Sequence, residues 1–228
     1  MMEELKRQAS IAALDAVTDG MIVGLGSGST VAYFIRELGV RVKGGLRIHG
    51  IPTSEDSRRL ATEVGVPLTN LREHPVIDVT VDGADEVSDD LDLIKGLGGA
   101  LVREKIVAHA SKRVIIVVDE SKLTSRLGIK APIPVEIIPF ALDLVRAQLL
   151  RWGGEPKIRE REGKTFISDN GNLILDWWHG RIDQPPLLEG QIKGLTGVVD
   201  SGIFSGVADQ VIAATAAGIR KMYRRSSV

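Results

Sequence analysis

The 228-residue sequence contains no cysteine and no long apolar run. Without cysteine the protein can form neither disulfides nor thiolate metal sites. The N-terminal residues lack the apolar stretch flanked by basic residues that marks a signal peptide, and none of the apolar runs approaches membrane-spanning length. These absences predict a cytoplasmic protein with no membrane partner.

An excess of charge of either sign is also missing. The 29 Lys and Arg side chains almost balance the 30 Asp and Glu, which leaves a net charge of -1. A general nucleic-acid-binding protein usually has a basic excess, so we expect no nucleic-acid partner. The four histidines, at positions 49, 74, 109 and 179, lack H-x-x-x-H or H-x-H spacing, and we therefore expect neither a metal site nor a His-based triad.

Hydrophobic residues are plentiful, at 43% of the chain, which suits one large domain or two small ones. In the first part of the sequence, apolar runs of strand type alternate with segments of helical periodicity. The expected strands are Met21–Leu25, Leu46–Ile51, Val76–Val81 and Arg113–Val118. The expected helices are Glu3–Val17, Val31–Leu38, a helix capped by Ser54 and ending at Val64, and Ala100–Ala110. This alternation predicts an α/β fold with a mostly parallel, doubly wound sheet.

The pattern changes after Gly128, where three prolines (132, 134 and 139) fall within eight residues. A helix over Pro139–Trp152, a hairpin around Glu162-Gly163 and a strand over Leu173–Trp178 then indicate a small α+β domain with an antiparallel sheet. Val207–Ala214 is apolar enough to return to the first sheet, and the basic tail 219–228 is expected to be peripheral. We therefore predict a catalytic domain of residues 1–130 plus 206–228 and an inserted domain of residues 131–205.

Three polar clusters follow the expected parallel strands, over residues 26–30, 82–85 and 119–122. Ligands of such sheets gather at the carboxyl ends of the strands. The first cluster lies in Gly24–Thr30, where a strand, a glycine-serine turn and a helix would aim backbone N–H groups at an anion. This turn is neither a Walker A loop nor G-x-G-x-x-G, so it indicates either a phosphate site or a tight turn with a Ser/Thr N-cap.

The stretch Val79–Glu104 concentrates chemically active residues. Asp82 and Asp85 flank a turn, and Lys95, a glycine-rich turn and Glu104 follow. A carboxylate can remove a proton next to a carbonyl, and a lysine with backbone amides can stabilise the resulting enediolate. The set suits proton transfer on a phosphorylated carbonyl compound. The alternative is a capped turn with surface acids and solvated lysines.

These motifs resemble those of ribose-5-phosphate isomerase of the A type, and the similarity runs nearly the whole chain. The N-terminal matches are Gly24-Leu25-Gly26-Ser27-Gly28-Ser29-Thr30, Val81-Asp82-Gly83-Ala84-Asp85-Glu86, Ile94-Lys95-Gly96-Leu97-Gly98-Gly99-Ala100, Arg103-Glu104-Lys105 and Ser121-Lys122-Leu123. The later matches are Pro134-Val135-Glu136-Ile137-Ile138-Pro139, Asp169-Asn170-Gly171-Asn172 and Gly197-Val198-Val199.

The resemblance implies a Rossmann-like domain and the interconversion of D-ribose 5-phosphate and D-ribulose 5-phosphate through an enediolate, with no metal or cofactor. It implies that Glu104 moves the proton, that Lys95 stabilises the enediolate oxygen, and that Asp82 and Asp85 hold sugar hydroxyls and assist ring opening. The implied substrate-binding residues are Ser27, Gly28, Ser29, Thr30, Asp82, Gly83, Ala84, Asp85, Lys95, Gly96, Leu97, Gly98 and Lys122, with Lys6 as a weaker phosphate candidate. The family also suggests a homodimer or homotetramer.

One residue departs from the family pattern: many members have Lys-Gly-Gly-Gly-Ala, whereas here Leu97 enters the turn, where it could narrow it or point inward. Three other classes of function stay open: another sugar-phosphate enzyme, a sugar-phosphate sensor and a dehydrogenase. An amino-sugar phosphate deaminase or a lactonase could use a similar fold, but a deaminase would favour a histidine in the cluster. A sugar-phosphate sensor would need an output module, and a dehydrogenase would need the G-x-G-x-x-G fingerprint.

Overall fold

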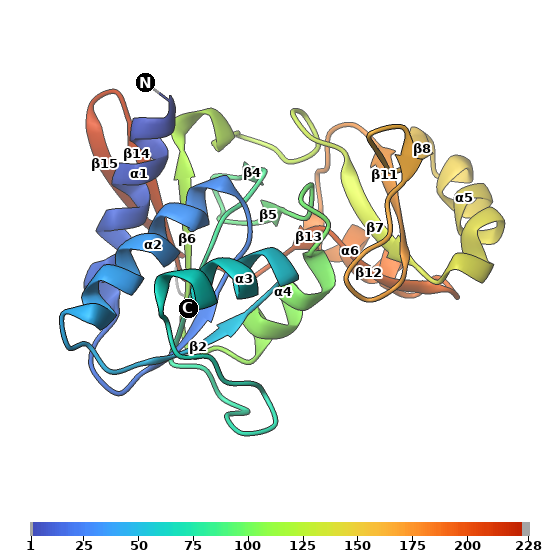
Figure 1. Cartoon of the computed structure of the whole chain (residues 1–228). Coiled ribbons are helices and arrows are strands. Elements are labelled where there is room, and N and C mark those ends of the chain that lie inside the picture. Colours follow the sequence, from blue (N-terminus) through green and yellow to red (C-terminus); the bar gives the residue numbers. More distant parts are fainter. Residues whose placement is uncertain (1, 225–228) are drawn as a thin grey trace. The chain divides into compact units, whose positions relative to one another are not determined.

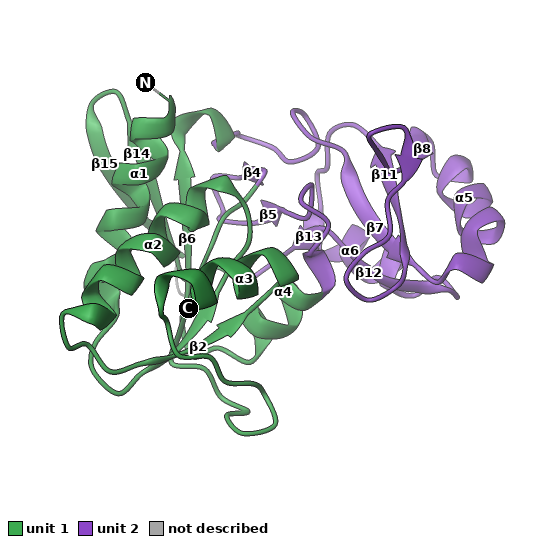
Figure 2. Cartoon of the chain, viewed as in Figure 1, with its two compact units in different colours: residues 1–84, 103–122, 207–228 green, residues 85–102, 123–206 purple. Residues whose placement is uncertain are grey.

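The computed structural model describes residues 2–224 (Figure 1). The chain forms two compact units (Figure 2): unit 1 comprises residues 1–84, 103–122 and 207–228, and unit 2 comprises residues 85–102 and 123–206. Unit 2 therefore includes residues 85–102 and 123–130, which the sequence had assigned to the catalytic domain. The two domains expected from the sequence, residues 1–130 plus 206–228 and residues 131–205, stay a prediction.

Unit 1 is built on a six-stranded sheet of order β15-β14-β6-β3-β1-β2. The strands are β1 (Ile22–Leu25), β2 (His49–Pro52), β3 (Val79–Asp82), β6 (Val114–Asp119), β14 (Gln210–Thr215) and β15 (Gly218–Tyr223). Every neighbouring pair is parallel except β14 and β15. The expected mostly parallel sheet is confirmed, and so is the return of the chain to it through β14.

Helices cover both faces of this sheet. Side chains of successive strand residues alternate between the faces, so apolar strands present side chains to be buried on each face. They are α1 (Met2–Ala13), α2 (Ser29–Lys43), α3 (Glu55–Val64) and α4 (Leu101–His109), with short 3-10 helices η1 (Leu14–Ala16) and η2 (Glu120–Lys122). Val23 and Leu25 of β1 pack in one core cluster with residues of α1, α2 and α3. Ile22 packs in another with Val107 of α4. The doubly wound prediction is confirmed.

Residues 219–223 of the tail that was expected to be peripheral belong to β15, the edge strand of the sheet, which pairs with β14 from Gly218 to Tyr223. Most of its side chains are exposed, so the strand shows no buried apolar face that a sequence pattern could reveal. Residues 225–228 of the tail lie outside the described residues.

Unit 2 contains the expected antiparallel sheet. Its order is β12-β7-β11-β8, with β7 (Ile133–Ile137), β8 (Glu155–Ile158), β11 (Leu173–Trp178) and β12 (Val198–Ser201). The unit also holds the hairpin β9 (Glu160–Arg161) and β10 (Lys164–Thr165), the small sheet of β4 (Glu86–Val87), β5 (Leu93–Ile94) and β13 (Ile203–Phe204), and the helices η3 (Pro139–Ala141), α5 (Leu142–Arg151) and α6 (Pro185–Lys193). Among residues 2–224, no helix is long and apolar enough to cross a membrane.

Candidate active site

The three polar clusters begin at the ends of β1, β3 and β6 of unit 1, and only Asp85, the last residue of the second cluster, belongs to unit 2. These strands are mutually parallel neighbours, in the order β6-β3-β1. Their carboxyl ends therefore lie along one edge of the sheet, where the sequence placed a ligand site. The residues predicted to contact substrate from this unit are Ser27, Gly28, Ser29, Thr30, Asp82, Gly83, Ala84, Glu104 and Lys122.

The glycine-serine turn leaves the start of α2 open. Gly28 is the N-cap with a φ of 102°, which favours glycine, and no side chain caps the helix. The first-turn amides, together with the positive end of the helix dipole, form an arrangement that favours an anion. Ser29 at this end is exposed, and a cavity of about 290 Å³ is lined by Gly26, Gly28, Ser29, Ala32, Ile35, Asp56, Ser57 and Leu60.

The Ser27 hydroxyl has partners within the protein. It lies 2.8 Å from Thr53 Oγ1 and donates to Ser54 Oγ at 2.6 Å. Ser54 in turn caps α3 and forms a capping box with Ser57, which confirms the expected N-cap. Ser27 thus ties the turn to the start of α3, and its hydroxyl is the least available of the serine and threonine hydroxyls that the sequence assigned to substrate.

Asp82 shapes the same turn from the neighbouring strand. Its side chain is buried, and Oδ1 accepts the amides of Ser27 at 3.0 Å and Gly83 at 2.7 Å. A Cβ at Gly26 would lie 2.1 Å from Asp82 Oδ1, so only glycine allows this approach. The carboxylate is therefore fixed in orientation by backbone donors, as a group that acts on substrate should be.

Glu104 lies in the first turn of α4 and is 4% exposed. The helix comes close to β1, because a Cβ at Gly24 would lie 2.8 Å from Val107 and 1.8 Å from Thr80 Oγ1. Asp82 lies two residues after Thr80 in β3, so the side chains of Asp82 and Thr80 point to the same face of the sheet, the face that α4 covers. Within unit 1 the proposed base and Asp82 therefore share a face.

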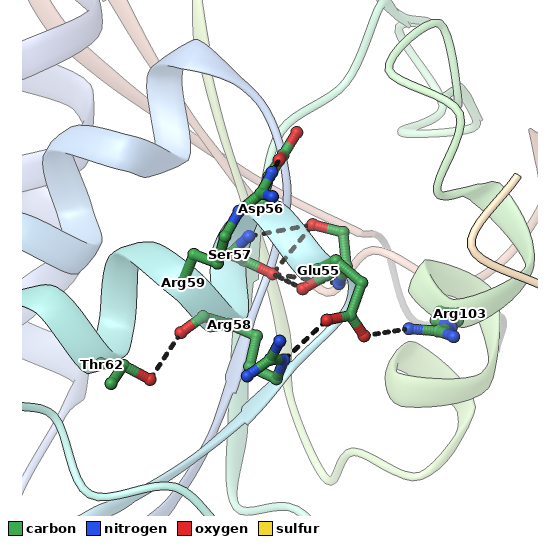
Figure 3. Close-up of polar contacts among 8 residues, drawn as sticks. Glu55, Asp56, Ser57, Arg58, Arg59, Thr62 and Arg103 are labelled. Carbon is green, nitrogen blue, oxygen red and sulfur yellow. Dashed lines mark hydrogen bonds and ion pairs between the residues drawn. The ribbon is translucent and has the colours of Figure 1, made fainter. Parts of the chain in front are cut away.

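Arg103, the residue before Glu104, links α4 to α3. Its Nη1 donates to Glu55 Oε1 at 3.2 Å, and Arg58 donates to the other oxygen at 2.7 Å (Figure 3). The hydrogen bond from Arg58, followed by that from Arg103, holds the pKa of the Glu55 carboxyl below its ordinary value. Sequence reasoning included Arg103 in a motif but gave it no role, since its partner is 48 residues away.

The residues of unit 2 that were predicted to act on substrate lie in the glycine-rich turn after β5 or contact it. Asp85 Oδ2 accepts the Leu97 amide at 3.0 Å, and Gly96 and Gly99 have φ values of 99° and 94°. Lys95 is 3% exposed, and its Nζ lies 5.4 Å from the centre of the Phe204 ring. Asp85, Lys95, Gly96, Leu97 and Gly98 are thus gathered within this unit.

The expectation that Leu97 points inward is wrong, because this residue is 38% exposed. The Leu97 amide donates a hydrogen bond to Asp85. The glycines of the turn differ in the space around them: a Cβ at Gly98 would meet nothing within 4 Å, whereas Cβ atoms at Gly96 and Gly99 would collide with Leu101 and Phe166.

Lys122, predicted to bind substrate, and Lys6, the weaker phosphate candidate, occupy different settings in unit 1. Lys122 ends η2 and is half-buried. Lys6 in α1 donates to Glu3 Oε1 at 2.7 Å. Within residues 2–224, no group of three or more His, Asp or Glu side chains is arranged to hold a metal ion.

Known proteins share this sequence and fold. Residues 49–218 match the family Ribose 5-phosphate isomerase A (phosphoriboisomerase A). The Ribose-5-phosphate isomerase A of Methanothermobacter thermautotrophicus is 50% identical over 219 residues, which cover 95% of this chain and 96% of that protein. The protein of the same name from Bradyrhizobium diazoefficiens is 46% identical over 235 residues, with coverage of 98% and 97%.

Two solved structures agree with these matches. Ribose 5-phosphate isomerase A from Methanocaldococcus jannaschii has a TM-score of 0.93 and 44% identity, covering 97% of this chain and 99% of that chain. A D-ribose-5-phosphate isomerase in complex with phospho-erythronic acid has a TM-score of 0.96 and 42% identity, covering 98% of this chain and all of that one. The protein therefore belongs to the ribose 5-phosphate isomerase A family.

Proposed function

We propose that this protein interconverts D-ribose 5-phosphate and D-ribulose 5-phosphate, as an aldose-ketose isomerase of the non-oxidative pentose phosphate pathway. The observation that carries the proposal is the likeness, over nearly the whole chain, to relatives that bear this name. A solved relative in complex with phospho-erythronic acid adds support, since that ligand carries both a phosphate and a carboxylate.

The proposed reaction moves one proton between carbons. Glu104 takes the proton from C2 of the open-chain aldose and returns it to C1, and the hydroxyl proton on O2 passes to O1 through the enediolate. The burial of Glu104 suits a carboxylate that must act as a base near neutral pH. Lys95 stabilises the negative oxygen of the enediolate, and Asp82 and Asp85 hold sugar hydroxyls and assist ring opening.

The phosphate is assigned to the start of α2. The amides that follow Gly28 lie at an uncapped helix N-terminus, and the hydroxyls of Ser29 and Thr30 belong to its first turn. Lys122 adds a positive charge. This assignment gives Ser27 the different task of holding the turn against Thr53 and Ser54.

The test measures ribulose 5-phosphate formation from ribose 5-phosphate in EDTA. We expect the wild type to be active and Glu104→Gln to bind substrate but lose roughly 10²–10⁴ in turnover, the range for a missing general base. Glu160→Gln, the same change at an exposed residue of β9, serves as the control. Near-normal turnover of Glu104→Gln would remove Glu104 from this role.

Three other results would change the proposal. An inactive wild type that binds ribose 5-phosphate would favour the sugar-phosphate sensor. An inactive wild type that does not bind it would favour another sugar-phosphate substrate, including those of a deaminase or a lactonase. Activity that disappears in EDTA and returns with a divalent cation would contradict metal-free isomerisation.

We also propose that the protein works in the cytoplasm as a homodimer or homotetramer. The family relationship supports this assembly. The molar mass from light scattering at micromolar concentration tests it, and the mass of a single chain would contradict it.

A further inference from the structure

Arg159 is a buried arginine that the proposed reaction does not use. It lies between β8 and β9 in unit 2 and is 7% exposed. Its backbone is fixed on both sides, since its amide donates to Ile174 O at 2.8 Å and its carbonyl accepts the Phe166 amide at 2.9 Å. A buried guanidinium needs charged or polar partners, so its contacts show what it does.

The guanidinium joins a carboxylate to the glycine-rich turn. Nε and Nη2 donate to the two oxygens of Asp176 in β11, the former at 2.9 Å. Nη1 donates to the carbonyls of Gly96 at 2.7 Å and Leu97 at 3.0 Å. These are the carbonyls of the two residues after Lys95, so one side chain holds the Gly96–Leu97 and Leu97–Gly98 peptide units next to the proposed oxyanion-stabilising lysine.

Two further contacts complete the hold on the turn. The Leu97 amide donates to Asp85 Oδ2 at 3.0 Å, so the peptide bonds around Leu97 are held by Asp85 at the N–H and by Arg159 at the C=O. The Phe166 ring packs against Gly99, where a Cβ would lie only 2.3 Å from the ring. Arg159 and Arg161 lie 6.0 and 4.7 Å from the centre of that ring.

We propose that Arg159, oriented by Asp176, is a positioning residue that holds the Lys95–Gly99 turn in its catalytic geometry. The inference rests on the proposed function, because it gives the turn its role through Lys95. Lysine cannot replace arginine here, because a single ammonium cannot span a two-oxygen contact with a carboxylate and two successive carbonyls at once.

The test is a double-mutant cycle on the full-length protein. We expect Arg159→Lys to keep the fold and to lower kcat at least about tenfold with little change in KM, since a small misplacement of a catalytic group costs turnover. In a Lys95→Ala background the same change should lower kcat less than about twofold, because the group that Arg159 positions is already gone. Arg181→Lys is the matched control, since it alters an exposed Arg–Asp pair of the same unit.

The outcomes separate the inference from the proposed function. Loss of kcat by the same factor in both backgrounds, or normal kcat in Arg159→Lys, would overturn the positioning role while leaving the isomerase proposal intact. A wild type without isomerase activity would overturn both. If Arg159→Lys does not fold, Asp176→Asn replaces it in the cycle with the same expected and overturning results, because it removes the charge that orients Arg159.

Discussion

Backbone amides fix both of the aspartates assigned to sugar hydroxyls. Asp82 accepts two amides at one oxygen, and Asp85 accepts the Leu97 amide. An aspartate held in this way does not need to reorganise as charge develops on the substrate. The sequence supplied the acids and their spacing, but their amide partners depend on turns whose conformations only the structure shows.

Lys95 gives a prediction at the scale of one residue. Because its charge should matter most when the enediolate oxygen becomes negative, Lys95→Ala is expected to lower kcat by roughly 10²–10³ with a smaller change in KM. The measurement is steady-state kinetics of ribose 5-phosphate isomerisation.

Because Lys95 is buried, the experiment needs a control variant with a side chain of similar volume. Lys95 is 3% exposed, so alanine also removes packed methylenes. Lys95→Met keeps most of the volume and loses the charge, and it should show the same fall in kcat. An unchanged kcat with a raised KM in both variants would instead make Lys95 a residue that binds substrate and product states equally.

Elements with a strong local signal were predicted closely. The Ser54 cap of α3 and the strand β11, which has the predicted bounds Leu173–Trp178, are examples. Pro134 shows the opposite case: proline is rare in paired strands, yet it lies in β7 between two neighbours. Its carbonyl accepts the Gly202 amide where the pairing with β12 ends, an arrangement that depends on a residue 68 positions later in the chain.

Glu86 anchors a loop of unit 2 to β4. It is fully buried, and its two oxygens accept the amides of Gly128 at 2.7 Å, Ala131 at 2.6 Å and Lys130. The sequence showed Glu86 only as the end of an acidic motif, next to Asp85. A strand-turn-strand pattern cannot reveal that a distant loop supplies three donors to one carboxylate.

Glu86→Gln is therefore expected to destabilise the protein by about 2 kcal/mol or more. Glutamine has one acceptor oxygen in place of two, so at least one buried amide loses its acceptor and faces another donor. The urea unfolding midpoint should fall relative to the wild type. Glu160→Gln, an exposed residue of the same unit, should leave the midpoint unchanged, and equal midpoints for the two variants would contradict the anchoring role.

Across the whole molecule, the features that sequence reasoning missed join distant parts of the chain. Arg159 holds carbonyls 62 and 63 residues earlier, and Glu86 binds amides 42 to 45 residues later. Local patterns predicted the elements and the acids, lysines and glycines of the site. The side chains that hold those groups in place have no local signature, because their partners are fixed only by the completed fold.

The carboxylates of unit 1 give a prediction for the stability of the molecule in acid. Several of them have a pKa below the ordinary value because cations, amides or hydroxyls hydrogen-bond to them: Glu3, Glu4, Asp19, Glu55, Glu73 and Asp78. The pKa of Asp78 is lowered first by Lys112 and then by the Ile22 amide. A group whose pKa is lower when folded stabilises the protein above its unfolded pKa, and this contribution is lost as pH falls through the folded value.

Thermal unfolding between pH 7 and pH 3 tests this expectation. Tm should stay nearly constant above about pH 5 and fall below about pH 4, where unfolded aspartate takes up protons at a pKa of about 3.9. Asp78→Asn should lower Tm at pH 7, where the wild-type carboxylate is ionised, and show a shallower fall in acid. Asp90→Asn, an exposed turn residue, is the control.

Salt at 1 M should weaken the effect of the exposed pairs more than that of Asp78, which the Ile22 amide also holds. A Tm that rises from pH 5 to pH 3, or parallel curves for wild type and Asp78→Asn, would contradict the role of these carboxylates.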